Sequence, residues 1–169
     1  NQAFALQPVW HGGAGELLAG CTAMASLVVG GKPVLFAFSK ATHQTAVYEL
    51  SDAAPWISQS AAQAGLGTDL GKQAWDSLNA FVLGNQPYLM AYERSSGTFG
   101  FFAVAADLSL SPPYLFVLVR NTPTQGFTSV GVYSSLGQIV FTGYDFDTGL
   151  VANFTLTVTA TSASGLPPL

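Results

Sequence analysis

The chain carries few side chains of the kinds that enzymes use to break bonds. It has two histidines, His11 and His43, and one cysteine, Cys21. No His-x-Glu-x-x-His or Cys-x-x-Cys pattern occurs, and one cysteine cannot form an intrachain disulfide or a zinc site built on several thiolates. These observations predict a protein that is not an enzyme and binds no cofactor. A hydrolase acting through His11 or His43 is the less favoured alternative.

Two aspartates, Asp145 and Asp147, alternate with Phe146 before Thr148-Gly149. This arrangement resembles half of a calcium-binding loop, but the third acidic ligand and the distal glutamate of such a loop are missing. A solvated hairpin turn is therefore favoured over a metal site, and we predict no bound metal.

Aromatic side chains with polar neighbours are the remaining functional candidates. A sugar stacks its apolar face on an indole ring while its hydroxyls bond to planar donors and acceptors. Trp10 and Trp56 fall near predicted unit boundaries, where binding and packing are equally favoured. His11 lies in a glycine-rich segment that favours a surface turn, and Trp75 is favoured as a core residue. The predicted ligand-binding residues are Trp10, His11, Trp56, Trp75, Asp76, Arg94, Arg120 and Gln125.

Composition excludes several other classes of partner. Charged residues make up 8% of the 169 residues, against about 25% in an average soluble domain. The net charge is −4 without a basic cluster, so we expect no nucleic-acid partner. The apolar stretch from Leu17 to Gly31 is shorter than the roughly 20 residues of a membrane span. The chain begins at Asn1 without a charged region before an apolar run, so a signal peptide is either already removed or never existed. We expect a secreted or extracellular protein, which fits the first case, with a cytoplasmic location left open.

The strongest pattern in the sequence is a threefold repeat of 52 to 54 residues. Cys21, Trp75 and Phe127 share one column, and the same offsets persist through the following strands and turns. The repeat predicts a single domain with units at approximately 13–60, 61–117 and 118–169. Further columns are Leu27, Phe81 and Tyr133; Leu35, Leu89 and Phe141; His43, Gly97 and Gly149; and Tyr48, Phe102 and Phe154.

Each unit is predicted to be a set of short antiparallel strands. Runs of β-branched and aromatic residues at 22–29, 76–83 and 128–134 precede glycine-containing turns, and second strands follow at 33–38, 87–92 and 139–144. A polar loop that ends in the His43, Gly97 or Gly149 column then leads into a third strand, with a left-handed turn conformation expected for His43. The small residues Ala37, Ala91 and Gly143 predict close packing on one face of the second strands.

Fourth strands are predicted around Pro55-Trp56-Ile57 and at 114–117, but the third unit lacks one. The segment 1–12, through Val9-Trp10, is predicted to complete that unit and remove an unpaired edge. Residues 57–74, an insertion in the second connection, are equally compatible with a surface loop and a short helix.

The repeated elements resemble those of repeat-blade β-propeller lectins of the tachylectin and tectonin kind. The resemblance rests on an aromatic residue followed by Asp-Ser or Thr-Ser, on Gly-Asn-Gln-Pro-Tyr-Leu at 84–89, and on Tyr followed by Ser-Gly or Thr-Gly. It implies an all-β fold of four-stranded propeller blades and a carbohydrate-binding module, with a glycan or small sugar as partner. The tryptophan that starts such blades stands only at Trp75.

Two alternatives remain open at this stage. A β-trefoil also repeats a four-stranded unit three times, although the small column favours the propeller. Three blades are too few for a closed propeller, which typically has about four to eight, so the propeller implies a homo-oligomer, with a dimer giving six blades. The alternative function is a structural or assembly protein that forms homo-oligomers through strand and apolar contacts.

Overall fold

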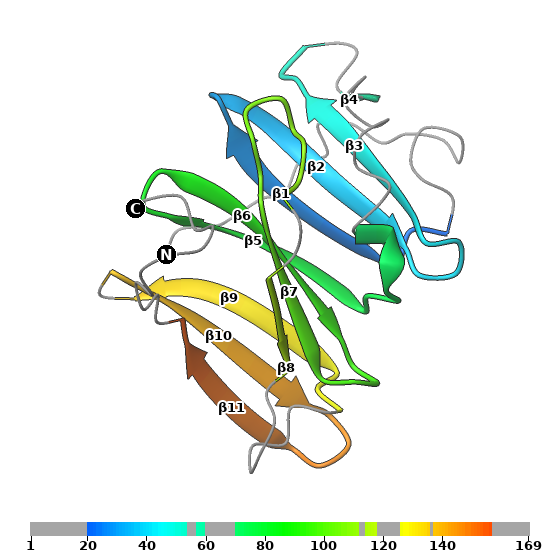
Figure 1. Ribbon diagram of the computed structural model, residues 1–169, viewed down its shortest axis with the longest axis vertical. Coiled ribbons are helices and arrows are strands. Elements are labelled where there is room, and N and C mark those ends of the chain that lie inside the picture. The colour runs from blue at the N-terminus through cyan, green and yellow to red at the C-terminus, as the bar shows by residue number, and fades with distance from the viewer. Residues whose placement is uncertain are drawn as a thin grey trace, which may run out of the picture.

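Three antiparallel sheets follow one another along the chain in a computed structural model that describes residues 20–53, 57–59, 70–111, 114–117, 126–135 and 137–156. Figure 1 shows the sheets stacked in chain order. The first sheet contains β1 (Ala23–Val29), β2 (Lys32–Ser39), β3 (Gln44–Leu50) and β4 (Ile57–Gln59). The second contains β5 (Ser77–Leu83), β6 (Gln86–Glu93), β7 (Thr98–Ala103) and β8 (Tyr114–Val117). The third contains β9 (Ser129–Ser135), β10 (Gln138–Asp145) and β11 (Leu150–Thr155).

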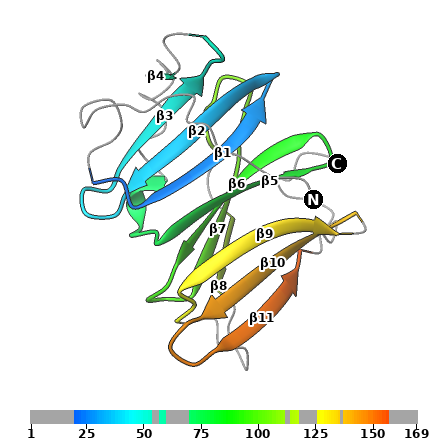
Figure 2. The same ribbon diagram turned by 180° about the vertical axis from the view of Figure 1, so that it is seen from behind.

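Every strand pairs with its neighbour in sequence, so each sheet is a simple meander. The first strands of successive sheets lie side by side, with β1 against β5 and β5 against β9, as Figures 1 and 2 show from opposite sides. Each repeat unit thus forms its own sheet and packs face to face on the next, as propeller blades do. The predicted all-β fold of repeated antiparallel units is confirmed, and the trefoil alternative is not supported.

The predicted strands agree with the observed ones to within one residue at most ends because the turn chemistry is explicit in the sequence. Glycines with positive φ connect the first and second strands of each sheet, at Gly30, Gly84 and Gly137. The second and third strands are connected through His43, Gly97 and Gly149, whose φ angles are 57°, 69° and 70°. The left-handed conformation predicted for His43 is confirmed. Its Nδ1 lies 2.9 Å from the carbonyl oxygen of Gly71, in the short 3₁₀ helix η2 (Leu70–Lys72).

A hydrophobic core fills the space between the first and second sheets. The first sheet contributes side chains from all of its first three strands, and the second contributes the faces of β5, β6 and β7 that point toward it. Trp75 belongs to this core and is fully buried. Its buried members include Val34, Phe36, Phe38, Val47, Leu70, Trp75, Leu78, Leu89 and Phe102.

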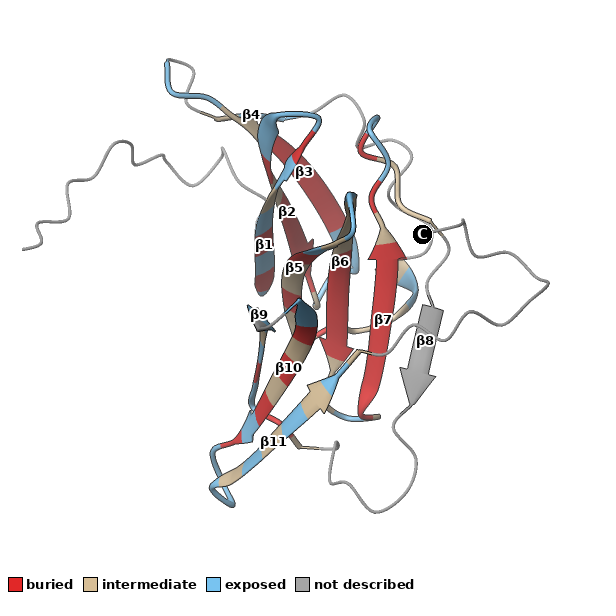
Figure 3. Cartoon of the chain, turned by 90° about the vertical axis from the view of Figure 1, so that its left-hand side faces the viewer, coloured by how far each residue is buried: buried red, intermediate tan, exposed pale blue. Residues whose placement is uncertain are grey.

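A second, aromatic-rich core lies between the second and third sheets. Figure 3 shows that β7 and the part of β6 from Leu89 to Tyr92 are buried, because both of their faces are covered. The opposite face of the second sheet meets the near face of the third. Edge-to-face and tilted ring contacts connect the two sheets, at centroid distances of 5.7 Å for Phe81 and Phe141 and 6.3 Å for Tyr92 and Phe127.

The close packing predicted for the small column is confirmed. Ala37 and Ala91 are buried, and a Cβ atom added to Gly143 would lie 2.6 Å from the ring of Phe127.

We expect Gly143→Ala to lower the free energy of unfolding by about 1–3 kcal/mol, because the buried ring must shift. Gly131→Ala on β9 is the matched control, since nothing lies within 4 Å of its added Cβ. Chemical denaturation of both variants tests this, and equal losses would contradict the packing argument.

The ionisation of Tyr92 makes the second core sensitive to alkaline pH. Burial is the main cause that raises the pKa of Tyr92 above its ordinary value of 10.0, and nearby Asp76 and Asp145 raise it further, against opposing contributions from the Phe127 backbone and Arg94. The folded state therefore holds the phenol proton more tightly than the unfolded state. This contribution to stability is present below pH 10 and is lost as the pH rises above it.

We expect the difference in unfolding free energy between the wild type and Tyr92→Phe to shrink as the pH rises above about 10. Urea unfolding of both proteins on either side of that pH measures the difference, and the variant controls for every other group that titrates there. A difference that is constant or grows with pH would show that the Tyr92 hydroxyl is not held in its neutral form.

Two predictions lie wholly or partly outside the described residues. The segment 1–12, predicted to complete the third sheet, is one, and residues 60–69 of the insertion are the other. Within the described part of that insertion, η2 is a short helical turn and β4 begins at Ile57. In the described residues the third sheet has three strands, as the repeat predicts for its own sequence.

Candidate functional site

The hairpins that join the second and third strands lie at the same end of the three sheets and are anchored alike. In each sheet, a side-chain oxygen just before the first strand accepts the backbone N–H of the first hairpin residue. Asp76 Oδ2 accepts from Arg94 N at 2.6 Å, and Thr128 Oγ1 accepts from Phe146 N at 2.9 Å. The first sheet has the same bond between Thr22 Oγ1 and Lys40 N at 3.0 Å. The repeat therefore places residues 40, 94 and 146 in equivalent positions.

Two of these equivalent residues are cations that cross to the next sheet. Lys40 Nζ pairs with Asp76 Oδ1 of the second sheet. Arg94 Nη2 pairs with Asp147 Oδ2 of the third sheet at 2.9 Å and lies 3.9 Å from Asp145 Oδ1. These ion pairs connect neighbouring sheets at the rim, where each cation keeps about 40% of its side chain exposed.

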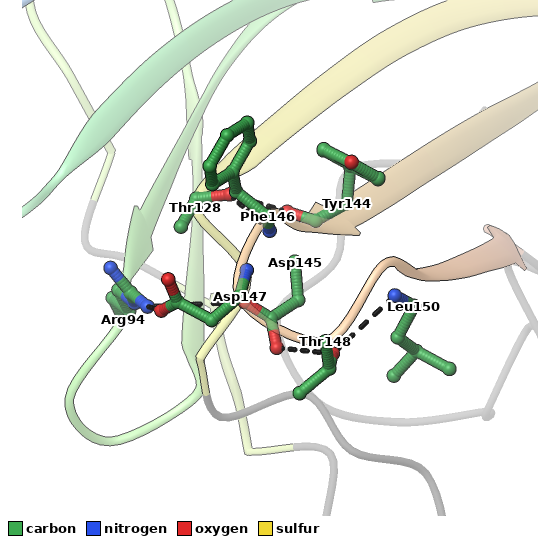
Figure 4. Close-up of polar contacts among 8 residues, drawn as sticks. All are labelled: Arg94, Thr128, Tyr144, Asp145, Phe146, Asp147, Thr148 and Leu150. Atoms are coloured by element: carbon green, nitrogen blue, oxygen red, sulfur yellow. Dashed lines mark hydrogen bonds and ion pairs between the residues drawn. The ribbon is translucent and has the colours of Figure 1, made fainter.

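The β10–β11 hairpin presents this polar network together with an exposed aromatic ring (Figure 4). Asp145 is buried and accepts hydrogen bonds from Thr148 Oγ1 and from the backbone N–H of Asp147. Asp147 itself is 71% exposed, and Phe146 between them is 75% exposed. The hairpin therefore offers an apolar ring, a guanidinium and an accessible carboxylate within one short segment and its neighbour.

Two of the predicted ligand-binding residues, Asp76 and Arg94, lie together at this rim, whereas the ligand-binding prediction for Trp75 is wrong. Asp76 and Arg94 are joined by the hydrogen bond described above. Trp75 cannot stack on a ligand in this structure, because it is fully buried, donates its indole N–H to Leu70 O at 2.7 Å and packs edge-to-face on Phe102. Its preferred interpretation as a core residue is confirmed. The predicted residues Trp10, His11, Trp56, Arg120 and Gln125 lie outside the described residues.

Phe146 was missed as a candidate in the sequence. The available signal was its column: the repeat aligns Phe146 with Lys40 and Arg94, so an aromatic residue stands where two charged residues are expected at the surface. An apolar side chain in a polar column at a hairpin tip is a stronger indicator of function than a tryptophan in an apolar column.

A second polar feature lies at the opposite end of the sheets, near the β1–β2 turn. A cavity of about 270 Å³ is lined by Val29, Lys32, Glu49, Asp107 and Leu108, among others. Lys32 and Glu49, which both line it, form an ion pair at 3.7 Å. Hydrogen bonds from Ser109 lower the pKa of Asp107. The described residues that line the cavity include no aromatic ring on which a sugar could stack.

Among the described residues, no group of three or more histidine, cysteine, aspartate or glutamate side chains could hold a metal ion. Asp145 and Asp147, the half calcium loop of the sequence, bond instead to Thr148 and Arg94. The described part of the chain also contains no helix that is long and apolar enough to cross a membrane.

Comparison with solved structures identifies the architecture. The structure is similar to that of an α-L-arabinofuranosidase from Clostridium thermocellum, with a TM-score of 0.57 and 13% sequence identity. The sheets are blades of a β-propeller. The match covers 81% of this chain and 47% of the arabinofuranosidase chain, so this chain spans about half the length of that protein. At this identity the likeness establishes the propeller fold alone.

A scan against protein-family models finds no match, and a search of curated proteins finds none either. The three sheets are called blades 1, 2 and 3 from here on.

Proposed function

We propose that this propeller segment is a carbohydrate-binding module without catalytic activity, and that its glycan contacts the β10–β11 hairpin of blade 3. One observation carries the proposal: Phe146 is 75% exposed on the hairpin whose Asp147 pairs with Arg94 of blade 2. An exposed ring beside planar donors and acceptors matches the two chemical faces of a sugar.

The polar groups retain capacity for a ligand after pairing with each other. A guanidinium has five N–H donors and a carboxylate about four acceptor positions, whereas the Arg94–Asp147 pair uses one hydrogen bond at 2.9 Å. Asp147 is largely exposed and Arg94 partly so. A vicinal diol can therefore donate to the carboxylate and accept from the guanidinium while its ring lies on Phe146.

Charge at the hairpin favours neutral over acidic glycans. Asp145 and Asp147 together outweigh Arg94, and the whole chain carries a net charge of −4. An anionic sugar would meet a site with net negative charge. The structurally similar enzyme is named for α-L-arabinofuranosides, which are neutral sugars, and we include them among the expected ligands. A secreted location stays a prediction from the sequence.

A glycan array followed by calorimetric titration tests the binding proposal. We expect a neutral glycan to bind with a micromolar or tighter Kd and Phe146→Ala to weaken it at least tenfold, about 1.4 kcal/mol. Val82→Ala is the matched control, because Val82 is a 51% exposed apolar residue on β5, away from this hairpin. No hit from folded protein across a broad array would overturn the proposal, as would binding that Phe146→Ala leaves unchanged.

The absence of catalysis is tested separately on arabinofuranoside and other glycoside substrates. We expect no turnover. Asp145 and Asp147 lie in the same hairpin turn and both interact with Arg94, whereas a glycosidase needs one carboxyl group to act as a general acid and another as a base or nucleophile. Hydrolysis that disappears in Asp145→Asn or Asp147→Asn, measured on protein shown to remain folded, would contradict this part of the proposal.

A further inference from the structure

The face of blade 3 that points away from blade 2 has no partner among the described residues, although its repeat equivalents are core. In blade 1 the equivalent residues pack on blade 2, and in blade 2 they pack on blade 3. The repeat aligns Val34, Phe36, Phe38 and Val47 of blade 1 with Tyr88, Met90, Tyr92 and Phe101 of blade 2, and these with Val140, Thr142, Tyr144 and Asn153 of blade 3.

Exposure separates blade 3 from the other two at these positions. Phe81, Phe99 and Met90 of blade 2 are buried. On blade 3, Tyr133 is 49% exposed and Val151 is 57% exposed, and they stand at the positions of Phe81 and Phe99. Tyr144, at the position of Tyr92, is 39% exposed. Tyr133, Val140, Tyr144 and Val151 therefore form a partly apolar sheet face, which we call the open face.

The β1 side of blade 1 presents part of the complementary surface. Met24 and Val28 on β1 are 52% and 60% exposed, and Leu35 lies beside them on β2 through the pairings of Ser26 with Leu35 and Val28 with Pro33. In the other blades, the residues equivalent to Met24 are Leu78 and Val130, and both are buried against the preceding blade. Ala37, Ala46 and Tyr48, on β2 and β3 of the same face, are buried. The exposed part of the face that would receive a preceding blade is therefore its β1 side.

We propose that the open face of blade 3 binds blade 1 of a second copy of this chain. The charges at the rim match this occupant. At both junctions within the chain, a cation of one blade meets an acid of the next: Lys40 meets Asp76, and Arg94 meets Asp145 and Asp147. At the junction between the open face and blade 1 of the second copy, the cation and the acid are both missing.

The missing charges are found by repeat position. Blade 3 has Phe146 in place of the cation. Blade 1 has Thr22, Ser39 and Ala41 where the later blades have Asp76, Asp145 and Asp147. The cation position of blade 3 and the acid positions of blade 1 are therefore both uncharged, whereas Asp145, Asp147 and Lys40 pair within the chain. No ion is left unpaired at the junction.

Two copies joined in this way form two identical junctions related by a twofold axis, since blade 3 of each copy meets blade 1 of the other. The ring then contains six blades, within the range of about four to eight that closes in propellers.

The proposal does not depend on the glycan site. Lys40 and Arg94 stay about 40% exposed although their blades are covered, so Phe146 at the equivalent position stays accessible at the rim.

Sedimentation and light scattering on the whole chain test the pairing. We expect a species of twice the 17.6 kDa chain mass that dissociates on dilution. Tyr133→Lys should weaken the dimer at least about tenfold, whereas Val82→Lys, which changes an exposed residue of blade 2 by the same charge, should not. Circular dichroism confirms that each variant remains folded, which is expected because Tyr133 is already half exposed.

A mixing experiment distinguishes the proposed pairing from other contacts of the open face. Met24→Glu on blade 1 should dissociate the dimer by itself, and mixing it with Tyr133→Lys should restore a mixed dimer, because the lysine and the glutamate then share one junction. The proposal is overturned by a monomer at every tested concentration, by a dimer that Tyr133→Lys leaves intact, by chains longer than two copies, or by a mixture that fails to pair.

Discussion

Replacing Trp75 with alanine is expected to lower the free energy of unfolding by about 3–5 kcal/mol. The indole is fully buried between blades 1 and 2, it packs edge-to-face on Phe102 at a centroid distance of 6.1 Å, and a Cβ on Gly100 would lie 2.7 Å from it. Such close contacts leave little room for the core to collapse into the cavity. Urea or thermal denaturation measures the loss.

Trp75→Phe is the matched control for the indole. It keeps most of the apolar volume but removes the N–H that donates to Leu70 O at 2.7 Å, which leaves a buried carbonyl without that bond. We expect a smaller loss, about 1–3 kcal/mol from the lost hydrogen bond and the smaller ring. A loss below about 1 kcal/mol for Trp75→Ala would show that this residue is exposed, and the ligand-binding interpretation of Trp75 would return.

Replacing Phe141 with alanine is expected to have a similar effect on the junction between blades 2 and 3, about 3–5 kcal/mol. Its ring is buried and makes edge-to-face contacts with Phe81 at 5.7 Å and Phe101 at 5.4 Å, both from blade 2. The loss should appear in chemical denaturation as a lower midpoint with a similar slope.

Phe146→Ala is the matched control in the same blade, because Phe146 is 75% exposed. We expect its unfolding free energy to stay within about 0.5 kcal/mol of the wild type. The pair of variants therefore separates an aromatic residue that stabilises the blade junction from one that is available to a ligand. Equal losses for both would contradict the distinction between them.

The strands could be predicted from the sequence because the repeat supplies three independent views of each element. A strand run such as 76–83 is supported by its two copies, and its turn by the glycine that follows. The positive φ of His43 was predictable for the same reason, since both equivalents are glycine. The close approach at Gly143 followed from a column of small residues, which only a packed face requires.

The candidate site was harder to predict, because it depends on how the blades stack. The sequence does not state that Arg94 of one blade reaches Asp147 of the next, 53 positions away. Tryptophan was weighted by its general affinity for sugars, yet Trp75 stands in an apolar column and is buried. Exposure at Phe146 follows from its place in a column of surface cations, a signal that depends on position rather than on residue type.

The open face of blade 3 has the same explanation. Its residues alternate like those of the other blades, so periodicity alone predicts burial on both sides. On this face and its rim, the third copy differs in sequence by the loss of two apolar residues, at Thr142 and Asn153, and of the rim cation, at Phe146. Thr142 and Asn153 bond to each other across β10 and β11, which lets this face tolerate water.

A crystal structure of the protein soaked with a panel of neutral monosaccharides, L-arabinose among them, tests the central claim most directly. The account predicts three blades with a sugar ring lying on Phe146 and its hydroxyls bonded to Asp147 and Arg94. A sugar bound elsewhere, with this hairpin free of crystal contacts and empty, would contradict it.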